Sequence, residues 1–253
     1  MSAAPLSVLL AEDNVVNQRV AAALLNTLGH KVTICNNGRE ALDALEASHF
    51  DIVLMDIQMP VMDGLEATAG IRALPDPVKA AIPILAISAN MREEDVTRYR
   101  HGGIDHVLAK PLRPASLRDM LTKVTGEPSA TRPAPGCAAA SPAPDELMDA
   151  AQVAALREAL PPDKLSELYG LARQSLLAGA DLLREGWSRD DPAEIGAAAH
   201  RLAGVARNFG CLALGECAAR IEEDAKRGHD GTAEQTAFEA LLTASLGALT
   251  TNR

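Results

Sequence analysis

The sequence predicts a doubly wound α/β domain with a five-stranded parallel sheet, followed by an all-α helical bundle. Its 253 residues favour two domains, at about 100 to 200 residues each. Before residue 126, five short apolar strands alternate with five amphipathic helical stretches, an order typical of a parallel sheet. After residue 144 only helical periodicity rich in Ala and Leu remains, which is typical of a helical bundle.

The predicted strands are short apolar runs rich in β-branched residues, which suit a sheet covered on both faces: 6–10, 31–35, 51–56, 82–88 and 106–109. The helices between them carry apolar residues three and four positions apart: 15–28, 38–47, 65–74, 92–100 and 114–124. Residues 126–144, GEPSATRPAPGCAAASPAP, cannot bury enough apolar surface to offset chain entropy. The predicted organisation is therefore a domain at 1–125, a linker at 126–144 and a second domain at 145–253.

Composition excludes several classes of function. The chain has 24 Lys and Arg against 34 Asp and Glu, a net charge of -10, which disfavours nucleic acid as a partner. No apolar run approaches the ~18 residues that span a bilayer, and Met1 begins no secretory signal. We therefore expect a cytoplasmic protein, or the cytoplasmic part of a membrane-anchored parent. The cysteines form no C-x-x-C pair and are expected to be reduced: Cys35, Cys137, Cys211 and Cys217.

Polar residues follow four of the five predicted strands. Glu12 and Asp13 come after the first strand, Asp56 ends the third, Ser88 the fourth, and Lys110 follows the fifth. Ligands of open parallel sheets bind at these carboxyl ends. Three adjacent carboxylates need a compensating cation, and their oxygens suit Mg²⁺. A phosphoryl group held there would be neutralised by the metal and Lys110, with Asp56 as the nucleophile.

Each of these residues also has a simpler interpretation. Asp13 or Asn14 could cap the following helix, Ser88 the next one, and Lys110 could lie in a solvated turn before Pro111. Because the polar residues recur at successive strand ends, a shared site is favoured over separate local roles.

The segments LLAEDNVVNQRV, LMDIQMPVMDG, AISAN and LAKPL resemble the receiver domain of two-component signalling, a flavodoxin-like fold, and in wording the receivers of hybrid sensor histidine kinases. The resemblance implies that Asp56 is the phosphoacceptor. It further implies that Mg²⁺ is held by Glu12, Asp13, Asp56 and the backbone carbonyl of Gln58.

The same resemblance implies that Ser88 and Lys110 contact the phosphoryl group. The family's switch aromatic, three residues before the lysine, is Val107 in this chain. The usual signal by ring rotation is therefore not expected here.

The segment DPAEIGAAAHRLAGVARNFG predicts a helix that starts near Pro192 and stops at Gly210. At ~100° per residue, His200 lies about 200° from Leu202 and is expected to face solvent. Gly196 and Gly204, four residues to either side, are expected to leave the imidazole clear for a second protein. The residues expected in the bundle core are Ile195, Ala198, Leu202, Val205 and Phe209.

By spacing alone, His200 could be an ordinary surface histidine. AHRLAGVARNFG is similar, however, to the motif of the histidine phosphotransfer (HPt) domain, a four-helix bundle, which implies that His200 carries a phosphoryl group. Ala203 stands where that family has a basic residue, and Arg207, nearly on the same helix face, is expected to compensate in part. The acidic run at 221–224 is predicted to be a solvated helix face.

These features predict a phosphorelay module that passes a phosphoryl group between phosphohistidine and Asp56, and between an aspartyl phosphate and His200. Because no glycine-rich nucleotide-binding segment is visible, the donor is expected to be a histidine kinase, in the same parent chain or separate. A receiver domain is expected to dock on His200. The domain order resembles the carboxyl-terminal part of a hybrid kinase.

Two other functions remain open. One is a response regulator whose helical domain is an unphosphorylated protein-binding output, which Ala203 favours. The other is a Mg²⁺-dependent phosphohydrolase, for which Ile57, Gln58 and Met59 offer no second acid/base carboxylate.

Overall fold

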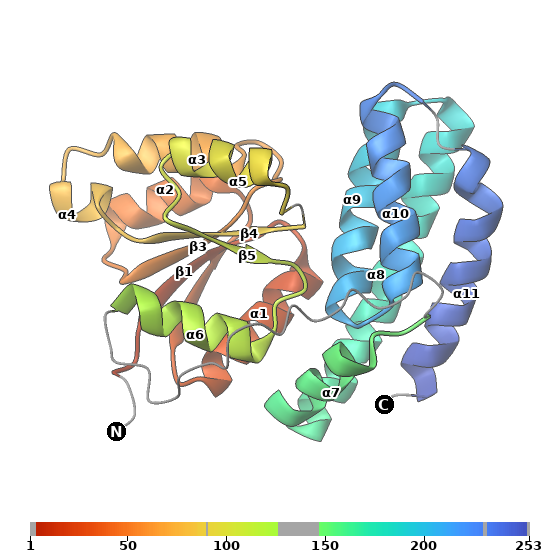
Figure 1. Ribbon diagram of the computed structural model, residues 1–253, viewed down its shortest axis with the longest axis horizontal. Coiled ribbons are helices and arrows are strands. Elements are labelled where there is room, and N and C mark those ends of the chain that lie inside the picture. The colour runs from red at the N-terminus through yellow and green to blue at the C-terminus, as the bar shows by residue number, and fades with distance from the viewer. Residues whose placement is uncertain (1–3, 90, 126–146, 230–231, 252–253) are drawn as a thin grey trace. The chain divides into compact units, whose positions relative to one another are not determined.

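The computed structural model describes residues 4–89, 91–125, 147–229 and 232–251 (Figure 1). The chain forms two compact units, Met1–Arg132 and Pro133–Arg253. The predicted linker at 126–144, with Cys137, lies outside the described residues. Within the part that is described, every helix is too short or too polar to cross a membrane.

The first unit is built on one parallel sheet. Its strands pair in the order β2-β1-β3-β4-β5, and every neighbouring pair is parallel. β3 and β4 are buried along their whole length, as expected of strands with helices on both faces. This confirms the predicted fold class. The strand bounds are β1 Ser7–Ala11, β2 Lys31–Cys35, β3 Ile52–Asp56, β4 Ile84–Ser88 and β5 His106–Ala109.

Helices cover both faces of this sheet. Figure 1 shows α2, α3 and α5 on one face and α1 and α6 on the other. The bounds are α1 Val15–Thr27, α2 Gly38–Ala47, α3 Gly64–Arg72, α4 Pro77–Ala80, α5 Glu93–His101 and α6 Pro114–Thr125. The sequence did not predict α4, because a helix of 4 residues is too short to show an apolar period.

Helix α3 begins directly against the end of β3. Asp63 caps the helix, and its partner Glu66 completes a capping box. A methyl group on Gly64 would overlap the backbone carbonyl oxygen of Asp56, so only glycine permits this close approach. The backbone N–H of Gly64 donates to the carbonyl of Ile57 at 2.9 Å. These contacts fix the loop that follows Asp56.

The second unit is a four-helix bundle. α8 contacts α9, α9 contacts α10, α10 contacts α11, and α11 returns to α8, while α7 packs on α8 (Figure 1). The five residues expected in the core, four in α9 and Phe209 at its C-cap, are all buried. The bounds are α7 Ala150–Ala159, α8 Pro162–Arg189, α9 Pro192–Asn208, α10 Leu212–Lys226 and α11 Gln235–Thr251, with a 3₁₀ turn η1 at Thr232–Glu234.

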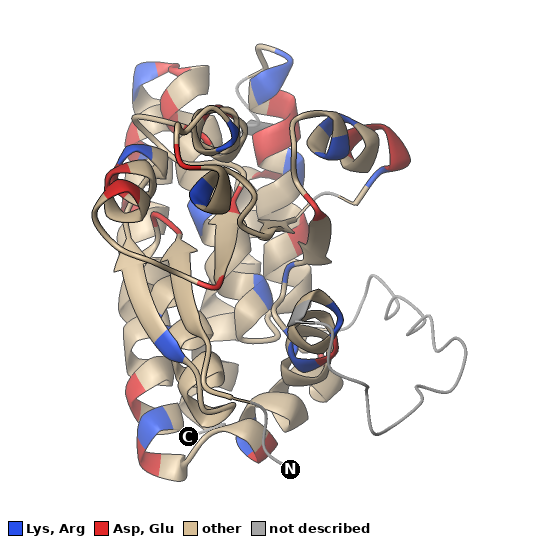
Figure 2. Cartoon of the chain, turned by 90° about the vertical axis from the view of Figure 1, so that its left-hand side faces the viewer, with Lys and Arg blue, Asp and Glu red and all other residues tan. Residues whose placement is uncertain are grey.

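The charged side chains of both units are of mixed sign. Figure 2 shows Lys and Arg interspersed with Asp and Glu along the helices. Arg184, for example, pairs with Asp181 at 2.7 Å and with Glu239 of α11 at 2.7 Å. The charge on these helices is therefore balanced locally, which suits solvated faces.

Candidate functional site

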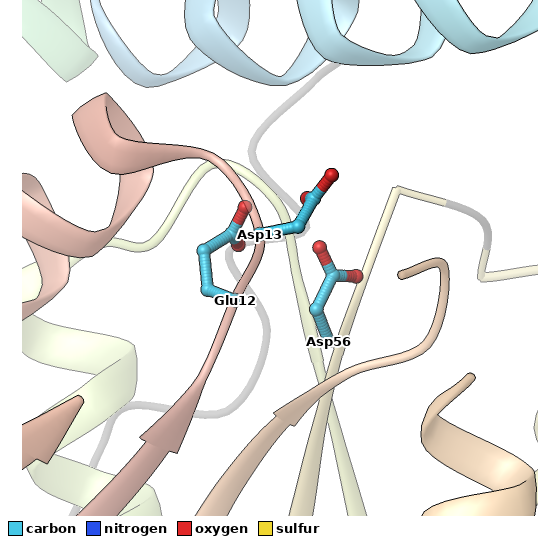
Figure 3. Close-up of side chains that lie close together, drawn as sticks. All are labelled: Glu12, Asp13 and Asp56. Carbon is cyan, nitrogen blue, oxygen red and sulfur yellow. The ribbon is translucent and has the colours of Figure 1, made fainter. Parts of the chain in front are cut away.

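The parallel register brings the predicted acidic residues together. Ala11 at the end of β1 lies beside Met55, one residue before Asp56 on β3. Glu12 and Asp13 continue from β1, so they emerge at the same edge as Asp56. Figure 3 shows the three carboxylates gathered above these strand ends. Their nearest oxygens all lie within 4.8 Å of one another.

Lys110 is the cation of this cluster. Its Nζ donates to Asp56 Oδ2 at 2.6 Å and to Glu12 Oε2 at 3.1 Å. All three side chains are buried, with at most 4% of each exposed. The structure therefore brings these predicted residues together in a buried network that joins β1, β3 and the end of β5.

Burial and charge act against each other in this network. Burial, together with the neighbouring Asp56, raises the pKa of Glu12, although Lys110 lowers it in part. Burial lowers the pKa of the Lys110 amine, but Asp56 and Glu12 outweigh it, so the net shift is upward. Lys110 therefore stays charged. One ammonium cannot balance three carboxylates, so the donor set fits a hard cation such as Mg²⁺.

The carboxylate of Glu12 already has protein partners on both oxygens. Oε1 accepts from Asn17 Nδ2 at 2.8 Å and from the backbone N–H of Asn14 at 3.3 Å, while Oε2 accepts from Lys110. Glu12 would thus meet a metal through water or by giving up one of these bonds. Asp13 and Asp56 are the more direct candidates.

The structure decides between the local interpretations of these residues. Asn14, and not Asp13, caps α1 by accepting from the backbone N–H groups of Val16 and Asn17. Ser88 does not cap α5, whose capping position is Arg92. Lys110 lies in the buried network and not in a solvated turn. Each outcome favours the shared site.

Gln58 lies beside Asp56. Its backbone N–H is 3.4 Å from Asp56 Oδ1. The assignment of its carbonyl as a metal ligand stays a prediction.

The aromatic ring near Ser88 comes from α5, a helix that the sequence predicted, although the contact itself was not predicted. The hydroxyl of Tyr99, the one buried residue of α5, lies 3.3 Å from Ser88 Oγ. Val107, at the family's switch position, is half-buried against the same apolar cluster as Tyr99. A tyrosine in an otherwise polar helix was the available signal for this contact.

His200 of α9 forms the centre of the second site. Its Nδ1 lies 3.2 Å from Glu222 Oε1 on α10, and Lys226 Nζ donates to the same oxygen at 2.5 Å. Only 18% of the His200 side chain is exposed. The expectation of an imidazole standing clear in solvent is therefore wrong, because α10 holds one edge of the ring.

The position of Glu222 follows from the helical hairpin. α9 and α10 run antiparallel on either side of Cys211, and His200 and Glu222 lie equally far from it along the chain. At ~1.5 Å rise per residue they reach the same height. The acidic run was expected to be solvated, but Ile221 and Glu222 are buried. Its second half, Glu223 and Asp224, is partly exposed.

Glu222 is ionised in this setting. Burial raises its pKa, but the hydrogen bonds and positive charges of His200 and Lys226 together lower the pKa of Glu222 to about 2. A carboxylate only accepts hydrogen bonds, so Nδ1 of His200 must carry a proton. When the ring is neutral, its lone pair is then on Nε2.

Gly196 faces α10. A Cβ there would lie 3.4 Å from the Cβ of Ala225, which is an ordinary van der Waals contact. The expectation that Gly196 leaves space for a second protein stays a prediction.

Arg207 runs across α10 near the same carboxylate. A Cβ at Gly215 would lie only 2.8 Å from Arg207 Cγ, so the Arg207 side chain packs directly against the backbone of α10 at this glycine. Burial lowers the pKa of the Arg207 guanidinium, although Glu222 and Glu216 oppose this. Its compensation for Ala203 stays a prediction.

Both units match known families. Residues 8–122 match the family model of the response regulator receiver domain, and residues 150–251 match that of the Hpt domain. The two matches fall on the two structural units and contain Asp56 and His200 respectively.

Curated relatives span most of this chain. It is 35% identical over 224 residues to the sensor histidine kinase AruS of Pseudomonas aeruginosa, which covers 88% of this chain and 21% of that protein. It is 29% identical over 239 residues to the sensor protein GacS of Pseudomonas syringae pv. syringae, covering 90% and 25%. The chain thus spans a quarter or less of the length of these relatives.

A solved structure resembles the first unit. It is the receiver domain of a sensor histidine kinase from Pseudomonas aeruginosa, with a magnesium ion coordinated in its active-site cleft. The identity is 38%, the match covers 49% of this chain and 100% of that chain, and the TM-score is 0.46.

Proposed function

Because this chain joins a response regulator receiver domain to an Hpt domain and functions in phosphorelay signal transduction, we propose a role for one residue in each domain. Asp56 is the aspartyl phosphoacceptor, and His200 is the phosphohistidine site. The observation that carries the proposal is the position of Asp56. It lies buried at the end of β3, among two further carboxylates and bonded to Lys110.

Phosphoryl arrival at Asp56 is a displacement at phosphorus. An Oδ atom of Asp56 attacks, the N–P bond of the donor phosphohistidine breaks, and the imidazole nitrogen keeps the electron pair. Lys110 neutralises the phosphoryl oxygens, and the hydroxyl of Ser88, on the neighbouring strand end, donates to one of them. Mg²⁺, when bound by Asp13 and Asp56, would supply the positive charge that Lys110 alone does not.

Transfer to His200 reverses this chemistry. The Nε2 lone pair attacks phosphorus, the P–O bond of an aspartyl phosphate breaks, and the carboxylate leaves with the electron pair. The proton on Nδ1 stays in place, shared with Glu222. The positive charge that develops on the ring is thereby stabilised.

We propose that the phosphoryl donor is a histidine kinase, in the same parent chain or separate. The similarity to a sensor histidine kinase of Pseudomonas aeruginosa supports this. We place the chain in the carboxyl-terminal part of a hybrid kinase, in the cytoplasm.

Labelling from acetyl phosphate tests the assignment of Asp56. We expect the full chain to gain one base-labile phosphoryl group when Mg²⁺ is present and none in EDTA, because the cluster needs the cation. Asp56→Asn should abolish the labelling, whereas Asp51→Asn, an exposed neighbour at the other end of β3, should leave it unchanged. Undiminished labelling of Asp56→Asn would overturn the proposal.

A further inference from the structure

We infer that Lys226 of α10 is the cation that lets His200 accept a phosphoryl group. It takes the place of the family's basic residue, which is Ala203 in this chain. The inference rests on the proposed role of His200. Its observation is the shared oxygen: Glu222 Oε1 contacts both His200 Nδ1 and Lys226 Nζ. Histidine, carboxylate and ammonium thus form one chain of contacts across α9 and α10.

The charge on Glu222 makes such a cation necessary. An incoming phosphoryl group carries about two negative charges, and it must settle next to an ionised carboxylate. The negative charges of the phosphoryl group and of Glu222 repel each other, and the repulsion is strongest where burial lowers the effective dielectric constant. Lys226 cancels the charge of Glu222 and leaves its hydrogen bond to the ring in place.

Lys226 is also free to move toward the phosphoryl group. Since both nitrogens contact one oxygen, Nζ lies within about 6 Å of Nδ1. The Lys226 side chain is 57% exposed, while that of Glu222 is 11% exposed. The carboxylate is therefore the fixed member of the pair, and the long lysine stem can turn its ammonium to the oxygens on Nε2.

The neighbouring arginines fit this role less well. Arg227, the next residue of α10, pairs with Glu223 at 2.8 Å. The aliphatic part of the Arg207 side chain packs over Gly215, and its guanidinium interacts with Glu222 only electrostatically. Lys226 combines a direct bond to Glu222 with an exposed, mobile amine.

Single-turnover transfer between two forms of the full chain tests the inference. The donor carries His200→Ala and is phosphorylated at Asp56 with acetyl phosphate and Mg²⁺. The acceptor carries Asp56→Asn and an affinity tag, so that only His200 can gain the group. Lys226→Ala in the acceptor should slow transfer by roughly fivefold or more, and Lys226→Arg should restore most of the rate. Arg227→Ala, an equally exposed neighbour, is the control and should change the rate less than twofold.

A second variant separates charge from structure. If Lys226 acts by cancelling the charge of Glu222, Glu222→Gln should recover part of the rate lost in Lys226→Ala. Lys226→Ala within about twofold of the parent acceptor overturns the inference, and so does equal slowing in Lys226→Ala and Lys226→Arg. Absence of transfer even to the parent acceptor, from a donor shown to be labelled, would instead overturn the proposed role of His200 and the inference with it.

Discussion

Lys110 holds two buried carboxylates, Asp56 and Glu12, through bonds of 2.6 and 3.1 Å. Removing its charge leaves both without their cation, and breaking a buried pair in this way costs about 3 kcal/mol or more. We therefore expect Lys110→Met to lower the free energy of unfolding of the receiver unit by that amount in EDTA. Urea denaturation measures the effect, and Mg²⁺ should recover part of it.

The control for this prediction is Lys123→Met, because Lys123 is exposed on α6. It should change the free energy of unfolding by less than about 0.5 kcal/mol. Equal losses in the two variants would mean that the network around Asp56 contributes nothing specific.

Glu222 gives the Hpt unit a dependence on pH. Its pKa in the folded chain is about 2, below the ordinary value of 4.5. A group whose pKa is lower in the folded chain stabilises that chain fully at pH values above its pKa in the unfolded chain. This stabilisation is lost as the pH falls through the pKa in the folded chain. We expect the stability difference between the parent and Glu222→Gln to be constant from pH 6 to 5 and to shrink from about pH 4.5 toward 2.

Thermal unfolding at a series of pH values measures this difference. Glu223→Gln, whose side chain is 43% exposed, is the matched control and should show a much smaller change. A difference for Glu222→Gln that is the same at pH 3 as at pH 6 would contradict the ionised pair with His200 and Lys226.

At the scale of elements, the contact between α3 and β3 positions the loop after Asp56. Gly64→Ala would force a methyl group against the carbonyl oxygen of Asp56, so the helix or the strand must shift. We expect a loss of about 1 to 3 kcal/mol in the free energy of unfolding and slower labelling of Asp56. Gly247→Ala in α11, where a Cβ meets nothing within 4 Å, should instead stabilise its unit by up to about 1 kcal/mol. Destabilisation of similar size in both variants would refute this account of Gly64.

Periodicity was sufficient to predict most elements. β2 and β5 have the predicted bounds, and the five main helices of the receiver unit differ by two residues or fewer at either end. These elements carry strong apolar patterns of their own. The boundary of α3 differs because the capping box at Asp63 starts the helix at Gly64, before its first apolar residue.

The two sites differed in how far sequence could predict them. Since the carboxyl ends of parallel strands lie at one edge of a sheet, the sequence could predict that four residues lie together there: Glu12, Asp13, Asp56 and Lys110. Glu222 and Lys226 were missed because their position depends on the pairing of two helices, which a single helical period does not contain. Counting outward from Cys211 on both helices would have indicated Glu222.

At the scale of the whole molecule, each unit has its own core. The largest fully buried side chains include Leu9, Leu54 and Met55 in the first unit and Tyr169, Phe209 and Phe238 in the second. We expect fragments 1–125 and 145–253 to fold separately, which circular dichroism would show. Fragment 1–125 should also be labelled by acetyl phosphate within about twofold of the rate of the full chain. An unfolded fragment, or a rate tenfold lower, would show that the two units depend on each other.

Locating the phosphoryl groups shows whether one chain carries both an aspartyl and a histidyl phosphoryl acceptor. The unmodified chain is incubated with acetyl phosphate and Mg²⁺, then mapped by mass spectrometry under conditions that preserve both acyl phosphate and phosphohistidine. We expect an acyl phosphate at Asp56 and a phosphohistidine at His200, with the His200 signal lost in Asp56→Asn. Phosphoryl groups on other residues, with Asp56 and His200 both unmodified, would contradict it.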